Sequence, residues 1–208
     1  MEIKEWKEKV LYTAKNGFDR LSDADRAAME GYCADYRAYL DASKTERECA
    51  VETIRLVEEA GFRPYQRGMA LAAGDKVYVS NRGKMVLLAV MGERSLSEGV
   101  QIAAAHIDSP RLDLKPSPLY EEGEMAYLKT HYYGGIRKYQ WVTVPLALHG
   151  VVALTDGRVI PVTIGEDKGP RLVINDLLPH LGQEQNKKTL AEGIAGEQLN
   201  LLVGSEPL

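Results

Sequence analysis

Two residues that could do chemistry, His106 and Asp108, lie two positions apart in the segment 99–110. An apolar run over residues 100–105 precedes them and a Ser-Pro pair follows, which predicts a buried strand that ends in a turn. Side chains two positions apart point to the same side of a strand, so the imidazole and the carboxylate would face one crevice. The imidazole could bind a metal ion, and the carboxylate could be a second ligand or a partner that orients the ring.

The other candidate side chains are three histidines and two cysteines. His131 and His149 lie in β patterns, where a hydrogen-bonded structural histidine is the more frequent outcome. His180 follows a proline among leucines, a setting that fits either a partly buried structural ring or a functional one. Cys33 and Cys49 lie in helical patterns without metal-ligand spacing, and we assign them no function.

The composition excludes several function classes. The 208 residues include 26 Lys and Arg against 30 Asp and Glu, a formal net charge of -4. The sequence has no clustered basic face, so we expect neither nucleic acid nor an anionic membrane surface as a partner. The N-terminus lacks the apolar core of a signal peptide, and the longest apolar runs, such as residues 85–91, are too short to span a bilayer. We therefore expect a cytoplasmic protein without membrane segments.

The elements that must position His106 follow an α/β pattern. Ser22 and Thr45 are each followed by an acidic residue three positions on, which predicts two capped helices, the second ending at Gly61. Residues 76–79 and 85–91 are then typical of two strands joined by a turn, an antiparallel hairpin. Because helices precede and accompany mixed strands, we expect an α/β fold.

Beyond the His106 segment the pattern becomes mostly β. Two prolines and an acidic stretch within residues 116–124 indicate an exposed boundary. Strand-like runs follow, and the polar tail is expected to be helical. The runs cover residues 125–133, 141–144, 146–154 and 159–164, and a turn at residues 155–158 predicts that the last two form a hairpin. We therefore predict two domains, residues 1–115 and residues 116–208.

Three motifs together resemble one enzyme family. They are Ala105-His106-Ile107-Asp108-Ser109-Pro110, Tyr132-Tyr133-Gly134-Gly135 and Leu178-Pro179-His180-Leu181. The chain is similar to the aspartyl aminopeptidase family of di-zinc metallo-aminopeptidases, and the motifs occur in the family's order. The resemblance covers essentially the whole chain and is far more specific than a His-x-Asp pair alone.

The resemblance implies a fold, an activity and roles for three residues. The fold would be a partial α/β/α zinc-exopeptidase catalytic domain followed by a β-rich dimerisation domain, and hence a homo-oligomer. His106 matches the family's first zinc ligand, and Asp108 matches the carboxylate that supports that ligand and the catalytic site. His180 matches a histidine described both as a zinc ligand and as a residue that reaches a neighbouring subunit's active site. Complete sites in the family hold two Zn2+ ions, and the substrates are peptides with a free N-terminus, often acidic.

The chain also departs from the family's pattern. The family's bridging Asp, its Glu-Glu pair with the general base, a further carboxylate ligand and its last His all follow the second domain. The sequence ends at Leu208 before any of them. His106 and Asp108 would supply at most two of the roughly three protein ligands of a catalytic zinc. We therefore expect an N-terminal fragment of a zinc aminopeptidase, or one product of a split gene, that is inactive alone.

Other classes of protein remain as alternatives. One is a non-catalytic oligomerisation or binding module derived from such an enzyme. Another is an unrelated hydrolase with His106 as a base, which is disfavoured because the sequence has no Gly-x-Ser-x-Gly elbow and no suitable Cys nucleophile.

Overall fold

A computed structural model describes residues 3–12, 14–166 and 169–206. The chain divides into two compact units, Met1–Ser43 and Lys44–Leu208. Among the described residues, no helix is both long and apolar enough to cross a membrane.

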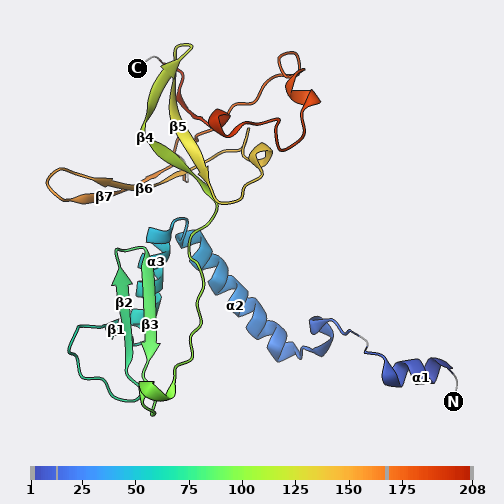
Figure 1. Cartoon of the computed structure of the whole chain (residues 1–208), viewed down its shortest axis with the longest axis vertical. Coiled ribbons are helices and arrows are strands. Elements are labelled where there is room, and N and C mark those ends of the chain that lie inside the picture. The colour runs from blue at the N-terminus through green and yellow to red at the C-terminus, as the bar shows by residue number, and fades with distance from the viewer. Residues whose placement is uncertain (1–2, 13, 167–168, 207–208) are drawn as a thin grey trace. The chain divides into compact units, whose positions relative to one another are not determined.

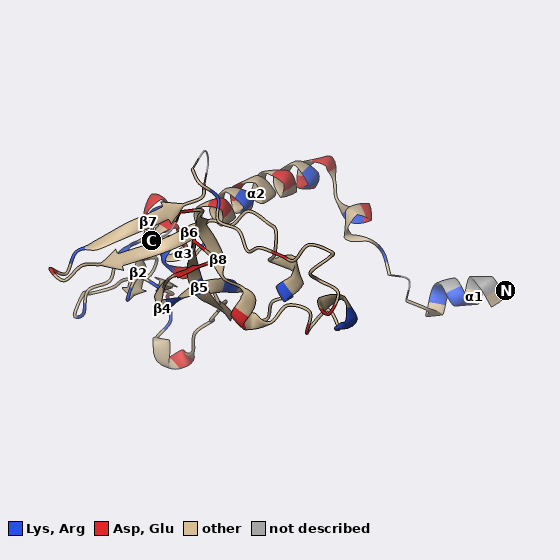
Figure 2. Cartoon of the chain, turned by 90° about the horizontal axis from the view of Figure 1, so that it is seen from above, with Lys and Arg blue, Asp and Glu red and all other residues tan. Residues whose placement is uncertain are grey.

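The first unit is helical. It contains α1 (Ile3–Val10), a short 3-10 helix (Gly17–Arg20) and α2 (Asp23–Ala42). The predicted cap of α2 is confirmed, because the Ser22 hydroxyl accepts a hydrogen bond from the Asp25 N–H and the Asp25 carboxylate accepts one from the Ser22 N–H. Acidic and basic residues are interspersed along α2 (Figure 2).

The second unit begins with a helix and a three-stranded sheet that lie side by side (Figure 1). They are α3 (Glu46–Glu59), β1 (Arg63–Pro64), β2 (Lys76–Asn81) and β3 (Met85–Val90). In the order β1-β2-β3, β1 is parallel and β3 antiparallel to β2, so the predicted hairpin is confirmed. Its turn uses left-handed backbone at Arg82 and Gly83, whose φ angles are 56° and 63°.

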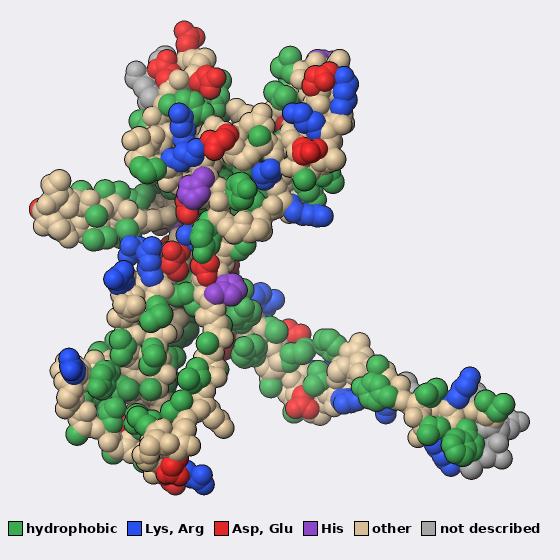
Figure 3. Space-filling view, viewed as in Figure 1, with side chains coloured by type: hydrophobic (Ala, Val, Ile, Leu, Met, Phe, Trp, Pro, Cys, Tyr) green, Lys and Arg blue, Asp and Glu red, His purple; other side chains and the backbone are tan. Residues whose placement is uncertain are grey.

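Large hydrophobic side chains of this sheet are exposed. Leu87 and Val90 expose 54% and 61% of their surface. Figure 3 shows hydrophobic side chains gathered over the sheet. An apolar cavity of about 280 Å³ lies on the same strands, with Val77 and Ala89 in its lining.

The buried strand predicted for residues 100–105 is wrong. These residues belong to no strand, and Val100 and Ile102 expose 61% and 82% of their surface. A strand needs a neighbouring strand to satisfy its backbone donors and acceptors, and none of the described strands pairs with this segment. His106, which is exposed, and Asp108, which is half-buried, therefore lie in irregular backbone that leads from a 3-10 helix (Leu96–Glu98) into β4.

The remainder of the second unit is β-rich, as predicted. Its strands are β4 (Arg111–Glu122), β5 (Met125–Tyr133), β6 (Leu148–Ala153), β7 (Val159–Ile164) and β8 (Leu201–Gly204). β4, β5 and β8 form one antiparallel sheet in that order, and β6 and β7 form a separate hairpin. β4 continues across residues 115 and 116, with a register shift between Leu114 and Leu119 where two prolines occur. The predicted domain division stays a prediction.

A hydrophobic core packs against β4, β5 and β8. Its buried members are Val142, Leu172, Ile174, Ile194, Leu199 and Leu201. The strand predicted at residues 141–144 is replaced by a turn after a 3-10 helix (Lys138–Gln140), because Thr143 has a φ of 62° and so leaves the extended path. The tail contains two short 3-10 helices, Gln185–Lys187 and Gly196–Gln198, in place of the predicted helix. The described residues thus form a mixed α/β fold.

Candidate metal centre

His106 presents one ring nitrogen to solvent. Its side chain is 82% exposed, and its Nδ1 lies 2.8 Å from the backbone oxygen of Asp108. A carbonyl oxygen only accepts hydrogen bonds, so Nδ1 is the donor in this contact, and the tautomer that fits it has its lone pair on Nε2. An imidazole nitrogen with a free lone pair is the ligand that zinc takes from histidine.

The Asp108 carboxylate lies between His106 and Tyr133. One oxygen is 3.4 Å from His106 Nδ1, and the other accepts a hydrogen bond from the Tyr133 hydroxyl at 2.8 Å. The Tyr133 hydrogen bond holds the pKa of Asp108 below its ordinary value, and Asp108 in turn raises the pKa of Tyr133. The carboxylate is therefore ionised and the phenol neutral near pH 7.

The guanidinium group of Arg111, in β4, packs against the face of the Tyr133 ring. The guanidinium carbon is 4.2 Å from the ring centroid, within the range of a cation–π contact. Arg111 Nε also donates a hydrogen bond to Asp113 at 2.7 Å, and its Nη2 is 3.6 Å from Glu46 of α3. Arg111 therefore joins β4, the end of β5 and the start of α3.

The first turn of α3 contacts the segment that carries His106. The buried Cys49 thiol donates a hydrogen bond to the Ile107 carbonyl at 3.4 Å. The predicted capping box fixes this turn, because Thr45 and Glu48 each accept a hydrogen bond from the other's backbone N–H. Cys49, to which the sequence pattern assigns no function, thus supports the backbone between His106 and Asp108.

Gly134, directly after β5, lies against Pro110. Gly134 has a φ of 75°, and a Cβ on it would lie 3.5 Å from the Pro110 Cα. Left-handed backbone of this kind favours glycine. The motifs at residues 105–110 and 132–135 therefore meet in the structure, through Tyr133 and through Gly134.

The motif around His180 lies apart from this network. His180 is exposed in a turn in which the Leu181 and Gly182 N–H groups both donate to the Leu178 carbonyl at 2.9 Å. In the part of the chain that the structure describes, no hydrogen bond or ion pair joins His180 to His106 or Asp108. The metal-binding or catalytic role of His180 stays a prediction.

The two remaining histidines bind protein groups. His149 lies between Glu48 and Glu166, with nitrogen–oxygen distances of 2.8 and 3.0 Å. His131 Nδ1 lies 3.3 Å from the backbone oxygen of Tyr132. Both rings thus contact protein groups, and the prediction that neither is a metal ligand stays a prediction.

The site fits a zinc ion in part. His106 offers Nε2, with the Asp108 carboxylate beside the ring. Among the described residues, no three His, Cys, Asp or Glu side chains are grouped so that they could hold a metal ion. A catalytic zinc has about three protein ligands, so His106 fits as one member of a ligand set that needs further residues.

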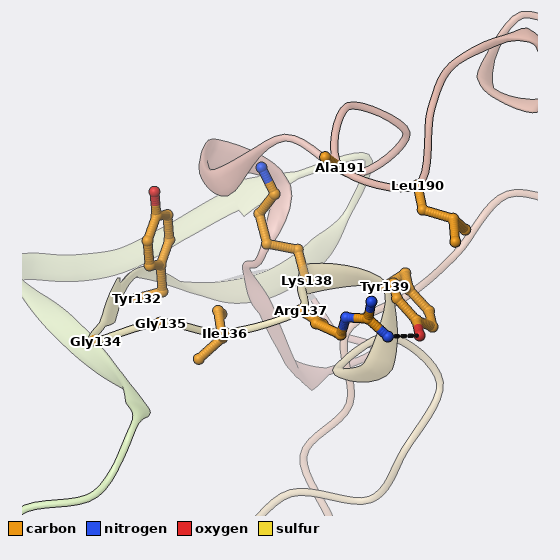
Figure 4. Close-up of a pocket in the computed structure, with 9 residues that line it drawn as sticks. All are labelled: Tyr132, Gly134, Gly135, Ile136, Arg137, Lys138, Tyr139, Leu190 and Ala191. Atoms are coloured by element: carbon orange, nitrogen blue, oxygen red, sulfur yellow. Dashed lines mark hydrogen bonds between the residues drawn. The ribbon is translucent and has the colours of Figure 1, made fainter.

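A cavity of about 340 Å³ is lined in part by Gly134 and Gly135 (Figure 4). Its wall includes Tyr132 and Gly134, and two basic side chains, Arg137 and Lys138. Arg137 Nη1 donates a hydrogen bond to the Tyr139 hydroxyl at 3.2 Å. Gly134 is shared with the His106 site, so the cavity adjoins that site.

The sequence pattern assigns no role to three residues of this network, Tyr133, Arg111 and Cys49. Tyr133 lies within a quoted motif, which is the one signal that could have indicated it. Arg111 and Cys49 lie in ordinary strand and helix patterns, and only their contacts in the folded chain reveal them.

The described residues form a mixed α/β protein with an exposed histidine, His106, a residue type that can coordinate a metal ion. The profile of the family described as aminopeptidase I zinc metalloprotease (M18) matches residues 39–204. The chain belongs to this M18 peptidase family.

Relatives and solved structures agree with this assignment. The probable M18 family aminopeptidase 1 of Clostridium acetobutylicum is 45% identical over 204 residues, which cover 96% of this chain and 44% of the relative. The crystal structure of an M18 aminopeptidase from Thermotoga maritima matches with a TM-score of 0.87 and 38% identity, over 95% of this chain and 43% of that one. Aminopeptidase I from Clostridium acetobutylicum matches with a TM-score of 0.83 and 41% identity, over 95% of this chain and 44% of that one. The chain therefore spans less than half the length of these proteins.

Proposed function

We propose that this chain supplies the His106 part of the zinc site of an M18 aminopeptidase, an enzyme that removes N-terminal residues from peptides. The observation that carries the proposal is the His106 geometry, in which Nδ1 donates to the Asp108 carbonyl at 2.8 Å and the ring is 82% exposed. The description of the family as a zinc metalloprotease supports the choice of metal. The resemblance to di-zinc aminopeptidases implies two ions in the complete site.

In this proposal, the residues around His106 prepare its ring for the metal. The Asp108 carbonyl fixes the tautomer, and the Asp108 carboxylate, 3.4 Å from Nδ1, increases the basicity of Nε2. Tyr133 holds that carboxylate through its hydroxyl. When bound, zinc supplies polarisation of the scissile carbonyl and a water molecule of lowered pKa.

We further propose that residues 1–115 belong to the catalytic domain and residues 116–208 to a domain that forms a homo-oligomer. Exposed leucines around His180 support an interface there, since Leu178 and Leu181 expose 66% and 70% of their surface. In the oligomer, His180 would bind zinc or reach the substrate in a neighbouring subunit's active site. The substrate would be a peptide with a free and acidic N-terminal residue, the class that the resemblance implies.

The second candidate is a non-catalytic oligomerisation module derived from such an enzyme. The observation that favours it is the lack of a three-ligand group among the described residues. The two candidates differ in whether further ligands complete the site around His106.

Zinc binding to the 208-residue chain tests the ligand assignment. The chain has four histidines, so a Zn2+ titration can be followed on four imidazole NMR signals. We expect the His106 signal to move first, and His106→Gln to abolish that binding. His131→Gln removes another exposed histidine and is the matched control. Zinc binding that survives His106→Gln unchanged would contradict the assignment.

Peptide hydrolysis tests the activity. The chain and a chimera that joins it to the C-terminal part of the Clostridium acetobutylicum relative are compared on peptides with N-terminal Asp, Glu or Leu. We expect the chain alone to release no N-terminal residue. The chimera should release N-terminal residues in a chelator-sensitive reaction that is fastest for the acidic ones. Release by the chain alone would contradict the incomplete ligand set. A folded, zinc-loaded chimera without activity would favour the non-catalytic module.

A further inference from the structure

His149 of β6 lies between two carboxylates that belong to different parts of the fold. Its Nδ1 is 2.8 Å from Glu48 Oε1 in α3, and its Nε2 is 3.0 Å from Glu166 Oε1, just after β7. An ionised carboxylate can only accept, so both contacts are hydrogen bonds only when both ring nitrogens carry protons. With 13% of its side chain exposed, the ring has the geometry of a sheltered imidazolium.

Glu48 connects this ring to the first turn of α3. Its Oε1 faces His149, while its Oε2 accepts hydrogen bonds from the Thr45 N–H at 2.9 Å and the Thr45 hydroxyl at 3.1 Å. The next residue, Cys49, donates its N–H to the Thr45 carbonyl at 2.8 Å and its thiol to the Ile107 carbonyl at 3.4 Å. The contacts therefore run without a break from His149 to the backbone between His106 and Asp108.

The position of the second carboxylate, that of Glu166, depends on the backbone conformation of Gly165. Gly165 has a φ of 97°, and a Cβ on it would lie 2.9 Å from the Ala147 Cα. Only glycine fits this close approach, which turns the chain so that Glu166 reaches the ring of His149.

We propose that His149 is a pH-sensitive positioning residue, whose protonated ring joins Glu48 to Glu166 and so holds, through Cys49, the segment that carries His106. This inference deepens the proposed function, because that segment holds the proposed zinc ligand, but none of its tests uses zinc. Loss of the ring's second proton would place a lone pair against a carboxylate and break one of the two bonds.

The direction of the pH dependence follows from the charges that face the ring. These are Glu48 from α3 and Glu166 from the loop after β7. Burial alone would lower the pKa of His149, but the hydrogen bonds and charges of the two carboxylates outweigh it and raise the pKa above its ordinary value. Burial opposes the charge of Glu48 as well, yet His149 and Thr45 hold the pKa of Glu48 below its ordinary value.

A raised histidine pKa stabilises the fold below the pKa of an unfolded histidine, and this stabilisation is lost as the pH rises through the folded value. A lowered glutamate pKa stabilises the fold above the pKa of an unfolded glutamate, and this is lost as the pH falls through the folded value. Both stabilising effects are therefore fully present between the pKa of an unfolded glutamate and the pKa of an unfolded histidine. The loss of stabilisation at higher pH is caused by deprotonation of His149.

NMR titration of the intact chain tests the proposal. We expect His149 to titrate above the ordinary histidine pKa of about 6.5, and the Ile107 carbonyl ¹³C signal to move with the same midpoint. The carbonyl is followed in a His106→Gln background, so that the neighbouring ring does not contribute. A His149 that titrates at the ordinary value, or an Ile107 carbonyl that does not follow it, overturns the proposal.

Variants separate positioning from simple packing. Glu48→Gln keeps a side chain suited to the capping box but removes the charge, so the His149 pKa should fall while α3 stays capped. Cys49→Ala should leave the His149 pKa raised but uncouple the Ile107 carbonyl from it. His149→Gln should reduce hydrogen-exchange protection of the Cys49 amide by about 10-fold, as expected for loss of a hydrogen bond to a charged group. Coupling that persists in Cys49→Ala would overturn the route through the thiol.

Discussion

Replacement of Tyr133 by phenylalanine tests how the Asp108 carboxylate is held. The change removes the hydroxyl that donates to Asp108 at 2.8 Å and keeps the aromatic face that Arg111 contacts at 4.2 Å. The cation–π contact should persist, because phenylalanine offers the same face to the guanidinium. The perturbation is therefore confined to one hydrogen bond.

The expected changes in the pKa of Asp108 and in zinc affinity follow from the contact of the Tyr133 hydroxyl with the Asp108 carboxylate. The Tyr133 hydroxyl is the largest of the influences that lower the pKa of Asp108, ahead of its own backbone and the charges of His106 and Arg111. Its removal should move the pKa of Asp108 up towards the ordinary value of 3.8. Removal of a group that contacts a metal-bound histidine directly lowers the metal affinity by about 10- to 100-fold. Tyr133 acts through Asp108, whose carbonyl still holds the ring, so we expect a loss at the lower end, about 10-fold.

Two measurements check this expectation. The Asp108 carboxyl ¹³C signal gives its pKa, and competition with a chromogenic chelator gives the zinc affinity of parent and variant. A lowered carboxylate pKa stabilises the fold above the unfolded pKa and loses this effect as the pH falls through the folded value. The stability difference between Tyr133→Phe and the parent should therefore disappear in acid.

Tyr132→Phe is the matched control. Tyr132 is the neighbouring residue and lines the adjacent cavity, and within the described residues its hydroxyl makes no hydrogen bond to Asp108. An Asp108 pKa that is unchanged in Tyr133→Phe, or shifted equally in Tyr132→Phe, would refute the reasoning.

Three further predictions concern other parts of the chain. Gly134→Ala should destabilise the protein by about 1 kcal/mol or more because of its φ of 75°, whereas Gly135→Ala, which meets nothing within 4 Å, should not; denaturant unfolding compares them, and equal losses would exclude backbone strain. Thr130→Val should lower the unfolding free energy by about 1–3 kcal/mol, because the buried Thr130 hydroxyl donates to the Leu199 carbonyl; an unchanged denaturation midpoint would contradict this bond. In the chimera, His180→Ala should reduce turnover by about 100-fold with zinc retained, and mixing with His106→Ala subunits should restore part of it; no recovery despite subunit exchange would confine His180 to its own subunit.

Local signals predicted the elements that depend on local contacts. The capping boxes at Ser22 and Thr45 close hydrogen bonds between residues three positions apart, so the sequence pattern contains both partners. The same holds for the β2–β3 and β6–β7 hairpins, whose short turns carry glycine at positive φ. Gly83 and Gly157 are the glycines concerned.

Predictions that depended on contacts between residues far apart in the sequence were less accurate. The run at residues 100–105 has the composition of a buried strand, but composition does not supply the neighbouring strand that would make it one. The bond from Tyr133 to Asp108 spans 25 positions, that from Cys49 to Ile107 spans 58, and that from His149 to Glu48 spans 101. No periodicity of 2 or 3.6 residues reports on separations of this size.

These long-range contacts explain how a histidine in irregular backbone can be held for a metal. A ligand at the end of a sheet strand is fixed by ladder hydrogen bonds, but His106 has none of these among the described strands. Its segment is instead held by the Cys49 thiol on Ile107, by the Tyr133 hydroxyl on Asp108, and by Gly134 against Pro110. Two of these three are polar contacts that depend on ionised partners, Asp108 directly and Glu48 through the first turn of α3. The orientation of the proposed zinc ligand should therefore respond to pH through Asp108 and through Glu48.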